Sequence, residues 1–449
     1  MGLKILIEFA VVVGAILMGS RSGGVGLGLW GGVGVLVLSY FFGLPPTAPP
    51  VDVMLIILAV IMATAVMEAA GGIEYLVHAA ERIIRKNPRQ ITIVAPIVSY
   101  IFTLGAGTGH VFYPLLPIIY EVAHENGIRP ERPIAVSTIA SQQAITASPV
   151  SAAMAAMIAL FEPAGLGLVH IILVAIPATL IGVFIAALVQ TRVGKELKDD
   201  PEYNRRMAEN ALLSACEGGT AAVTTVKVKR ELPATGKTSA MIFLAGVGFI
   251  VLAGLFPVLR PQILKGNAMV PLDMATSIQI VMLSIAALIL VLTKVPAASV
   301  TRTNSSQAGL TAVIGIFGLA WLGDTFIKGN EKVIIGLIGD LTTAYPISFS
   351  FGLFFASVLL FSQAATTRAL MPLGISLGIP SQYLVAMWPA VNGYFFLPTY
   401  GTIIAAINFD RSGTTRIGKY VLNHSFMLPG LVSTACAVTA GLVLAGLFF

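Results

Sequence analysis

Two polar interruptions in otherwise apolar segments hold the residues best suited to binding a small anion. One is Gly107-Thr108-Gly109-His110, and the other begins at Ser362 and Gln363 and ends near Arg368. Small and polar residues at membrane depth leave backbone N–H and C=O groups without helical partners, and such backbone is tolerated only where it lines a cavity or a binding site. The two stretches therefore predict the tips of two re-entrant hairpins that bind a polar solute.

A second pair of interruptions follows the first. Gln143 and Asn392 each stand six residues before a proline, Pro149 and Pro398. A proline within a span removes one hydrogen-bond donor and displaces the preceding turn, which frees carbonyls and amides near the middle of the bilayer. We expect two broken helices here, brought against the two tips by an internal pseudo-symmetry.

The predicted site favours an anion because the second arm of each hairpin begins at its tip. The positive end of the helix dipole and the first N–H groups then point into the site, beside the hydroxyls of Thr108, Ser362, Thr366 and Thr367. A solute with a carboxylate at each end would use both tips. The predicted binding residues are Gly107, Thr108, Gly109, His110, Ser148, Pro149, Ser151, Ser362, Gln363, Ala364, Ala365, Thr366, Arg368, Asn392, Pro398 and Thr399.

Charged and titratable residues near the tips have alternative interpretations. Arg368 either pairs with a substrate carboxylate or reaches water or a backbone carbonyl, since an uncompensated guanidinium at membrane depth is costly. For His110 a structural hydrogen bond is favoured over a role as ligand or proton carrier.

Five charged residues farther from the tips also have two interpretations. Glu68 and Asp324, which close corresponding spans, either bind a coupling cation or proton or simply meet the interface; the second is favoured. Glu81, Arg85 and Arg129 either steer anions toward the cytoplasmic mouth of the first hairpin or follow the positive-inside rule, and the rule explains most of that charge.

The composition predicts the elements that position these residues. Hydrophobic residues make up 56% of the 449 residues and charged residues only 11%, which is typical of a polytopic membrane protein. The basic residues form no compact patch with aromatics, so nucleic acid is excluded as a partner. Cys216 and Cys436 cannot build a zinc cluster, and no protease, hydrolase or Walker motif occurs. We expect no enzyme, metal or cofactor.

Apolar runs predict about ten transmembrane helices and two hairpins, an all-α fold. The hairpins cover about 91–123 and 347–378, and their arms of about 16 residues rise about 24 Å, less than the hydrocarbon core of about 30 Å. The spans lie near 3–19, 24–43, 53–70, 133–161, 170–191, 239–259, 272–293, 307–324, 382–408 and 425–446. Gly28 and Gly32 suit a close helix contact in this scaffold or at a subunit interface.

The distribution of basic residues predicts the orientation. Most of the 27 Lys and Arg residues fall in loops on one side of these spans, which is the cytoplasmic side by the positive-inside rule. Both termini are then periplasmic, and the two hairpins enter from opposite sides. The predicted organisation is an N-terminal repeat over 1–192 with the first hairpin and the broken helix 133–161, a cytoplasmic linker over 193–238, and an inverted C-terminal repeat over 239–449 with the second hairpin and the broken helix 382–408.

Along nearly its whole length the chain resembles the anaerobic C4-dicarboxylate transporters, the DcuA/DcuB family. The resemblance rests on the motifs Ala70-Gly-Gly-Ile-Glu-Tyr-Leu76, Gly107-Thr-Gly-His110, Ile128-Arg-Pro-Glu-Arg-Pro133, Ala147-Ser-Pro-Val-Ser151, Ala320-Trp-Leu-Gly-Asp-Thr325, Ser362-Gln-Ala-Ala365, Leu397-Pro-Thr-Tyr400 and Asp410-Arg-Ser-Gly-Thr-Thr-Arg-Ile-Gly418. The first tip is more similar to the B branch and the second to the A branch, which leaves the subtype open.

The resemblance implies a function and an architecture. It implies exchange of fumarate, malate or aspartate for succinate across the bacterial inner membrane, by a mobile transport domain that slides as an elevator against a homodimeric scaffold. A sensor kinase partners the B branch, and whether this chain has that partner stays open. Two alternatives remain: a sodium- or proton-coupled carboxylate symporter or cation/proton antiporter that uses Glu68, Asp324 or His110, and a membrane sensor that signals through its linker.

Overall fold

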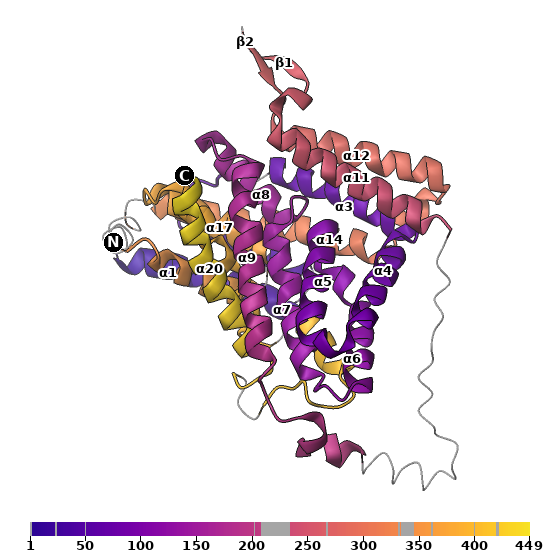
Figure 1. Cartoon of the computed structure of the whole chain (residues 1–449). Coiled ribbons are helices and arrows are strands. Elements are labelled where there is room, and N and C mark those ends of the chain that lie inside the picture. Colours follow the sequence, from indigo (N-terminus) through magenta and orange to yellow (C-terminus); the bar gives the residue numbers. More distant parts are fainter. Residues whose placement is uncertain are drawn as a thin grey trace.

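The structure is a computed structural model that describes residues 2–22, 25–49, 51–201, 203–207, 234–265, 268–330, 333, 345–360, 362–398, 400–418 and 422–449. These residues are mostly helical, which confirms a mostly α-helical polytopic membrane protein, while the inverted repeat and the elevator type stay predictions. A two-stranded antiparallel hairpin, β1 (Gln262–Lys265) and β2 (Ala268–Pro271), projects beyond one end of the helical body, at the top of Figure 1.

The described residues of the first half form nine α-helices and three short 3-10 turns. Its elements are α1 (Gly2–Ser22), α2 (Gly26–Tyr40), α3 (Val51–Ala69), α4 (Gly72–Lys86), η1 (Pro88–Gln90), α5 (Ile91–Ala106), η2 (Gly109–Phe112), α6 (Leu115–Glu125), α7 (Glu131–Ala147), α8 (Ala152–Phe161), η3 (Glu162–Ala164) and α9 (Leu168–Gln190).

The second half follows a short turn, η4 (Leu197–Asp199), and residues 208–233 of the predicted linker, which lie outside the described part. Its elements are α11 (Gly236–Leu255), η5 (Pro257–Leu259), α12 (Met274–Thr293), α13 (Ala297–Val300), α14 (Asn304–Gly315), the π-helical turn η6 (Ile316–Ala320), α16 (Ser348–Leu360), α17 (Gln363–Ser376), α18 (Ser381–Met387), η7 (Trp388–Phe395), α19 (Gly401–Phe409) and α20 (Met427–Phe448).

The helices make this a multi-pass membrane protein. Within the described residues, seven helices are long and apolar enough to cross a membrane, or up to eight if α3 and α4, which meet at a 74° bend, count as one span. Every predicted span falls on a helix or on a broken helix. The number that crosses the bilayer stays a prediction.

Both predicted hairpins are helix–break–helix segments. In the first, α5 ends because Gly107 adopts a left-handed conformation (φ +71°) and closes the helix with an N–H bond to the Thr103 carbonyl. In the second, α16 ends at Leu360 and Ser362 begins α17. Because Pro88–Ala106 is itself long and apolar enough to count as a candidate span, re-entry of the first hairpin stays a prediction.

Two groups of helices pack mainly within themselves. The first, here called the scaffold group, consists of α1, α2, α3, α11, α12 and the helix over 304–330. The second, here called the core group, consists of α5, α7, α8, α9 and α16 to α20, and its most extensive contact joins α9 to α20, the last long helices of the two halves. Gly28 was correctly predicted to allow a close helix contact, since a Cβ at Gly318 would lie 1.7 Å from its carbonyl oxygen, whereas Gly32 has open space.

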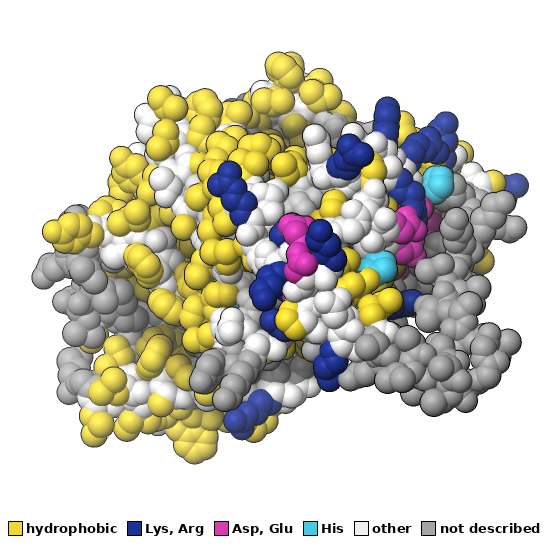
Figure 2. Space-filling model, turned by 60° about the horizontal axis from the view of Figure 1, so that its bottom comes forward, with side chains coloured by type: hydrophobic (Ala, Val, Ile, Leu, Met, Phe, Trp, Pro, Cys, Tyr) yellow, Lys and Arg dark blue, Asp and Glu magenta, His cyan; other side chains and the backbone are white. Residues whose placement is uncertain are grey.

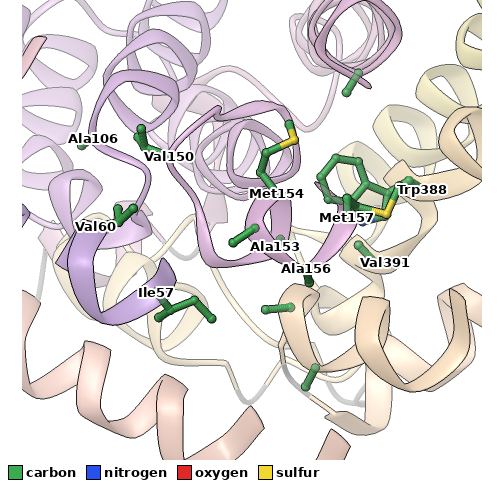
Figure 3. Packing of buried hydrophobic residues seen from close by; sticks show 14 of the residues in the cluster. Ile57, Val60, Ala106, Val150, Ala153, Met154, Ala156, Met157, Trp388 and Val391 are labelled. Atoms are coloured by element: carbon green, nitrogen blue, oxygen red, sulfur yellow. The ribbon is translucent and has the colours of Figure 1, made fainter. Parts of the chain in front are cut away.

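The helix α8 belongs to the core group and packs against α3 and α12 of the scaffold group. Figure 3 shows its small side chains Ala153 and Ala156 among Ile57 and Val60 of α3 and Trp388 and Val391 of η7. Most of α8 is buried, so the break that precedes it is held from both sides. This placement fixes the start of α8 within the body of the protein.

The basic residues lie unevenly over the surface. Figure 2 shows the bottom of the molecule, where many Lys and Arg side chains gather, while hydrophobic side chains dominate one flank. The chain that enters the linker leaves α9 at this end, and α20 ends far from it (Figure 1). The orientation predicted from the loops stays a prediction.

Candidate functional site

The two broken helices meet through the polar residues that precede their prolines. Asn392 of η7 donates from Nδ2 to Gln143 Oε1 of α7 over 3.1 Å and to Thr146 Oγ1 over 3.3 Å. Asn392 itself has a non-helical backbone (φ −97°, ψ 25°) and is buried. Gln143 continues the chain of bonds by donating to Thr434 of α20 over 3.1 Å. The two halves are therefore joined at the pair of residues that the sequence aligns.

The second hairpin tip bonds to both broken helices. Gln363, the first residue of α17, donates from Nε2 to Gln142 Oε1 of α7 and to Asn392 Oδ1, both over 3.2 Å. Gln142, Gln143, Thr146, Gln363, Asn392 and Thr434 together form the amide network. All six are buried and neutral, and buried amides bonded in this way fix the relative positions of the segments that carry them.

The first hairpin tip lies against the first break and the same network. A Cβ added at Gly107 would lie 2.6 Å from the Val150 carbonyl oxygen, and one added at Gly109 would lie 2.8 Å from Gln142 Nε2. Ser148, at the end of α7, donates its hydroxyl to the Leu104 carbonyl of α5 over 2.6 Å. A side chain at Gly107 would collide with backbone atoms of Val150, whereas the atom nearest to Gly109 is the end of the Gln142 side chain.

Two helix N-termini at the site have corresponding caps. The Ser151 hydroxyl accepts from Met154 N at the start of α8, and the Ser362 hydroxyl accepts from Ala365 N at the start of α17. These two helices, one from each half, pack against each other. Each presents the positive end of its dipole and its first N–H groups, which is an arrangement suited to an anion.

A hairpin arm of the first half, α6, also packs on a broken helix of the second half, α19. The start of α19 lies against the turn before α6. A Cβ added at Gly401 would lie 3.0 Å from the Tyr113 hydroxyl. The rings of Tyr394 and Tyr400 lie 4.6 Å apart beside this contact. In both pairs, a hairpin arm from one half faces a broken helix from the other.

The small residues behind the second tip are buried and close-packed. Ala364, Ala365 and Thr366 lie in the first turn of α17. The Thr366 hydroxyl donates to the Ser362 carbonyl, and the Thr367 hydroxyl donates to the Gln363 carbonyl and accepts from Trp388 Nε1. These hydroxyls therefore bond within the protein and brace the tip in this conformation.

Arg368 has a partner that was not among the alternatives considered from the sequence. Its guanidinium lies 3.6 Å from the carboxylate of Asp324, and both side chains are mostly buried. The pair joins α17, in the core group, to the helix over 304–330, in the scaffold group. Two charges that were interpreted separately thus form one ion pair across the boundary between the groups.

Glu68 binds the start of a helix. Its two carboxylate oxygens accept from the backbone N–H groups of Asn304 and Ser305, at 3.1 and 2.9 Å. A carboxylate there stabilises the first turn of α14 through the helix dipole. This contact accounts for the position of Glu68 without a coupling ion, and its predicted coupling role stays untested.

The residues predicted to steer anions form ion pairs. Arg85 bonds to Glu81 and Glu121 at 2.8 and 2.9 Å. Arg129 is 4% exposed and pairs with Glu131 and Asp200, which links the start of α7 to the beginning of the linker. Burial lowers the pKa of Arg129, but the two carboxylates outweigh it and raise that pKa above its ordinary value. The Arg129 charge is thus compensated inside the protein, and steering stays a prediction.

Some of the remaining residues predicted to bind substrate are placed by the structure, and others lie outside its described part. Thr108 lies at the first tip, Pro149 and Pro398 are buried at the two breaks, and Thr399 and the side chain of His110 lie outside the described part. Among the described residues, no group of three or more His, Cys, Asp or Glu side chains is arranged to hold a metal ion. The sequence reasoning missed Gln142, Thr146 and Thr434 as partners, although polar residues in apolar helices were the available signal.

A mostly helical membrane body, with crossed helix N-termini around buried polar breaks, defines a multi-pass membrane protein with an internal polar site. The chain belongs to the family described as anaerobic C4-dicarboxylate membrane transporters, whose model matches residues 4–449. It is 42% identical over 441 residues to the C4-dicarboxylate transporter DcuA of Escherichia coli K12 (98% of this chain, 99% of the relative).

Two further relatives have similar coverage. The DcuA protein of Wolinella succinogenes is 40% identical over 441 residues (98% of this chain, 99% of the relative), and the anaerobic C4-dicarboxylate transporter DcuB of Escherichia coli O6:H1 is 38% identical over 447 residues (98% of each). The family membership confirms transport rather than catalysis.

Proposed function

We propose that this protein is a secondary antiporter of the bacterial inner membrane that exchanges fumarate, malate or aspartate for succinate. The observation that carries the proposal is the packing of each hairpin arm on the broken helix of the other half, α17 on α8 and α6 on α19, with serine-capped N-termini on α8 and α17. Two pairs of N–H clusters suit a solute with two carboxylates better than one with a single charge. The relatives are C4-dicarboxylate transporters, which indicates a four-carbon diacid.

The core group is the mobile part in this proposal, and the scaffold group is the fixed part. The core group moves as an elevator past the scaffold group. The resemblance to the family implies that the scaffold group forms a homodimer. The Arg368–Asp324 ion pair supports this division, because it crosses the boundary and must change partners if α17 slides. Both termini are periplasmic, in agreement with the side on which the basic residues gather.

The two repeats and the linker keep their predicted bounds, 1–192, 193–238 and 239–449. The hairpin arms pack on the broken helices in the same way in both halves: α5 packs on α7, and α16 packs on η7. In each half a hydrogen bond also joins the broken helix to the first hairpin arm, from the Ser148 hydroxyl to the Leu104 carbonyl and from Gly393 N to the Ser357 hydroxyl. A repeat of this kind is typical of alternating-access transporters.

Counterflow in proteoliposomes tests the exchange. Vesicles loaded with labelled succinate should release it rapidly only when fumarate, malate or aspartate is present outside. Equal release without an external dicarboxylate would refute obligate exchange. Acceleration by a sodium or proton gradient would instead support the coupled symporter that the sequence left as an alternative.

A further inference from the structure

The four proposed substrates differ only in the middle of the molecule. Succinate, fumarate, malate and aspartate share two terminal carboxylates, and they carry hydrogens, a double bond, a hydroxyl or an ammonium group at C2 and C3. Helix N-termini bind carboxylates and therefore cannot distinguish these compounds. Discrimination requires a side chain that faces the centre of the substrate and can form a hydrogen bond with the C2 substituent.

Gln142 occupies the position between the two tips. Its Oε1 accepts from Gln363 at the second tip over 3.2 Å, and its Nε2 lies against Gly109 at the first tip, where a Cβ would come within 2.8 Å. Gln142 is 1% exposed and lies six residues before the break at Ser148, less than two helical turns. The carboxamide thus has its acceptor directed to one tip and its donor directed to the other.

The chemistry around Gln142 limits how an ammonium or a hydroxyl is recognised. The amide network contains only neutral side chains, so no carboxylate within it offsets the charge of an ammonium group. A carboxamide oxygen accepts equally from a hydroxyl and from an ammonium, and it offers nothing to a CH₂ or CH group. Gln363 can yield its bond to Gln142, because it also bonds to Asn392.

We propose that Gln142 determines the substrate specificity of this transporter by accepting a hydrogen bond from the C2 substituent of malate or aspartate. The inference rests on the proposed function, because it assumes that a C4-dicarboxylate lies between the tips. Gln142 then separates the substrates with a polar C2 group from succinate and fumarate. Gln143, its neighbour, has a different role because both ends of its amide hold the two halves together.

Competition assays test the proposal. Uptake of labelled fumarate into succinate-loaded proteoliposomes is measured against unlabelled succinate, malate and aspartate. Gln142→Leu should raise the half-inhibitory concentrations of malate and aspartate about tenfold relative to that of succinate, because the lost bond is specific to them. Gln142→Glu should shift the preference toward aspartate by about tenfold, since a carboxylate attracts the ammonium and repels a dianion.

Gln143→Leu is the matched control, with the same change one residue away. It should weaken competition by all substrates alike. If both Gln142 variants change succinate, malate and aspartate by the same factor, Gln142 has only a structural role and the proposal is overturned. If Gln142→Leu fails to fold, the nearly isosteric Gln142→Glu tests the proposal alone. A shift of its preference toward aspartate supports the proposal, and no shift overturns it. Wild-type protein that carries none of these compounds would refute the proposed function instead.

Discussion

Asn392 donates a hydrogen bond to Gln143 across 3.1 Å, although 249 residues separate them in the chain. Each stands six residues before the proline that breaks its helix, so the bond joins equivalent positions of the two halves. Asn392 also accepts a hydrogen bond from Gln363 at the second tip, and Gln143 donates one to Thr434 of the last helix, α20. In the proposed repeat this polar contact lies at the centre, next to the proposed substrate position.

Asn392→Leu should abolish transport and destabilise the protein. The substitution leaves the buried amides of Gln143 and Gln363 without their shared partner, at a cost of about 1–3 kcal/mol. Thermal unfolding in detergent should show a lower Tm. Thr439→Val is the control, because this exposed hydroxyl bonds only to the Ala435 carbonyl of its own helix. Equal Tm values for the two variants would contradict the role given to Asn392.

Gly107→Ala should stop transport by pushing the first tip away from the first break. A Cβ there meets the Val150 carbonyl oxygen at 2.6 Å, in addition to the strain of a left-handed backbone. Gly127→Ala is the control that measures the cost of the left-handed backbone without a steric contact, because Gly127 has a similar φ of +69° and open space around it. We expect Gly107→Ala to lower the free energy of unfolding by about 1–3 kcal/mol more than Gly127→Ala does. Identical losses would mean that the contact with Val150 is unimportant.

Arg368 and Asp324 should behave as a coupled pair. Arg368→Gln or Asp324→Asn alone removes the ion pair but keeps the other mostly buried charge, whereas the double variant removes both charges. Unfolding measurements on the four proteins should give a coupling energy of about 0.5–3 kcal/mol. Additive effects would exclude the pair as a stabilising contact. Transport by the double variant distinguishes further: restored exchange argues against direct binding of substrate by Arg368.

Ser362→Ala should weaken succinate binding by loosening the second tip. The substitution removes the hydroxyl that accepts from Ala365 N and so costs the start of α17 about 1 kcal/mol, whereas glycine at the same position costs only a few tenths. Calorimetric titration of purified protein with succinate should show the lower affinity for Ser362→Ala and a smaller change for Ser362→Gly. Unchanged affinity in both variants would place the site elsewhere.

The fold was largely predictable because each signal is local. Glycine and serine end or begin the hairpin arms, and Pro149 and Pro398 mark the breaks, so the elements follow from residue type and spacing. The equivalent spacing of Gln143 and Asn392 before their prolines could be read from the sequence, but the bond between the two side chains was not predicted. In contrast, the partners of Glu68, Arg368 and Gln142 come from distant segments, and only the packing of the helices decides which polar groups meet.

A cryo-electron microscopy map of the protein with bound succinate tests the central claim most directly. The account predicts density for the diacid between the two hairpin tips, with one carboxylate within hydrogen-bonding distance of the first N–H groups of α17 or α8 and the chain of the diacid beside Gln142. Density for succinate remote from both tips, with the tips packed as they are here, would contradict it.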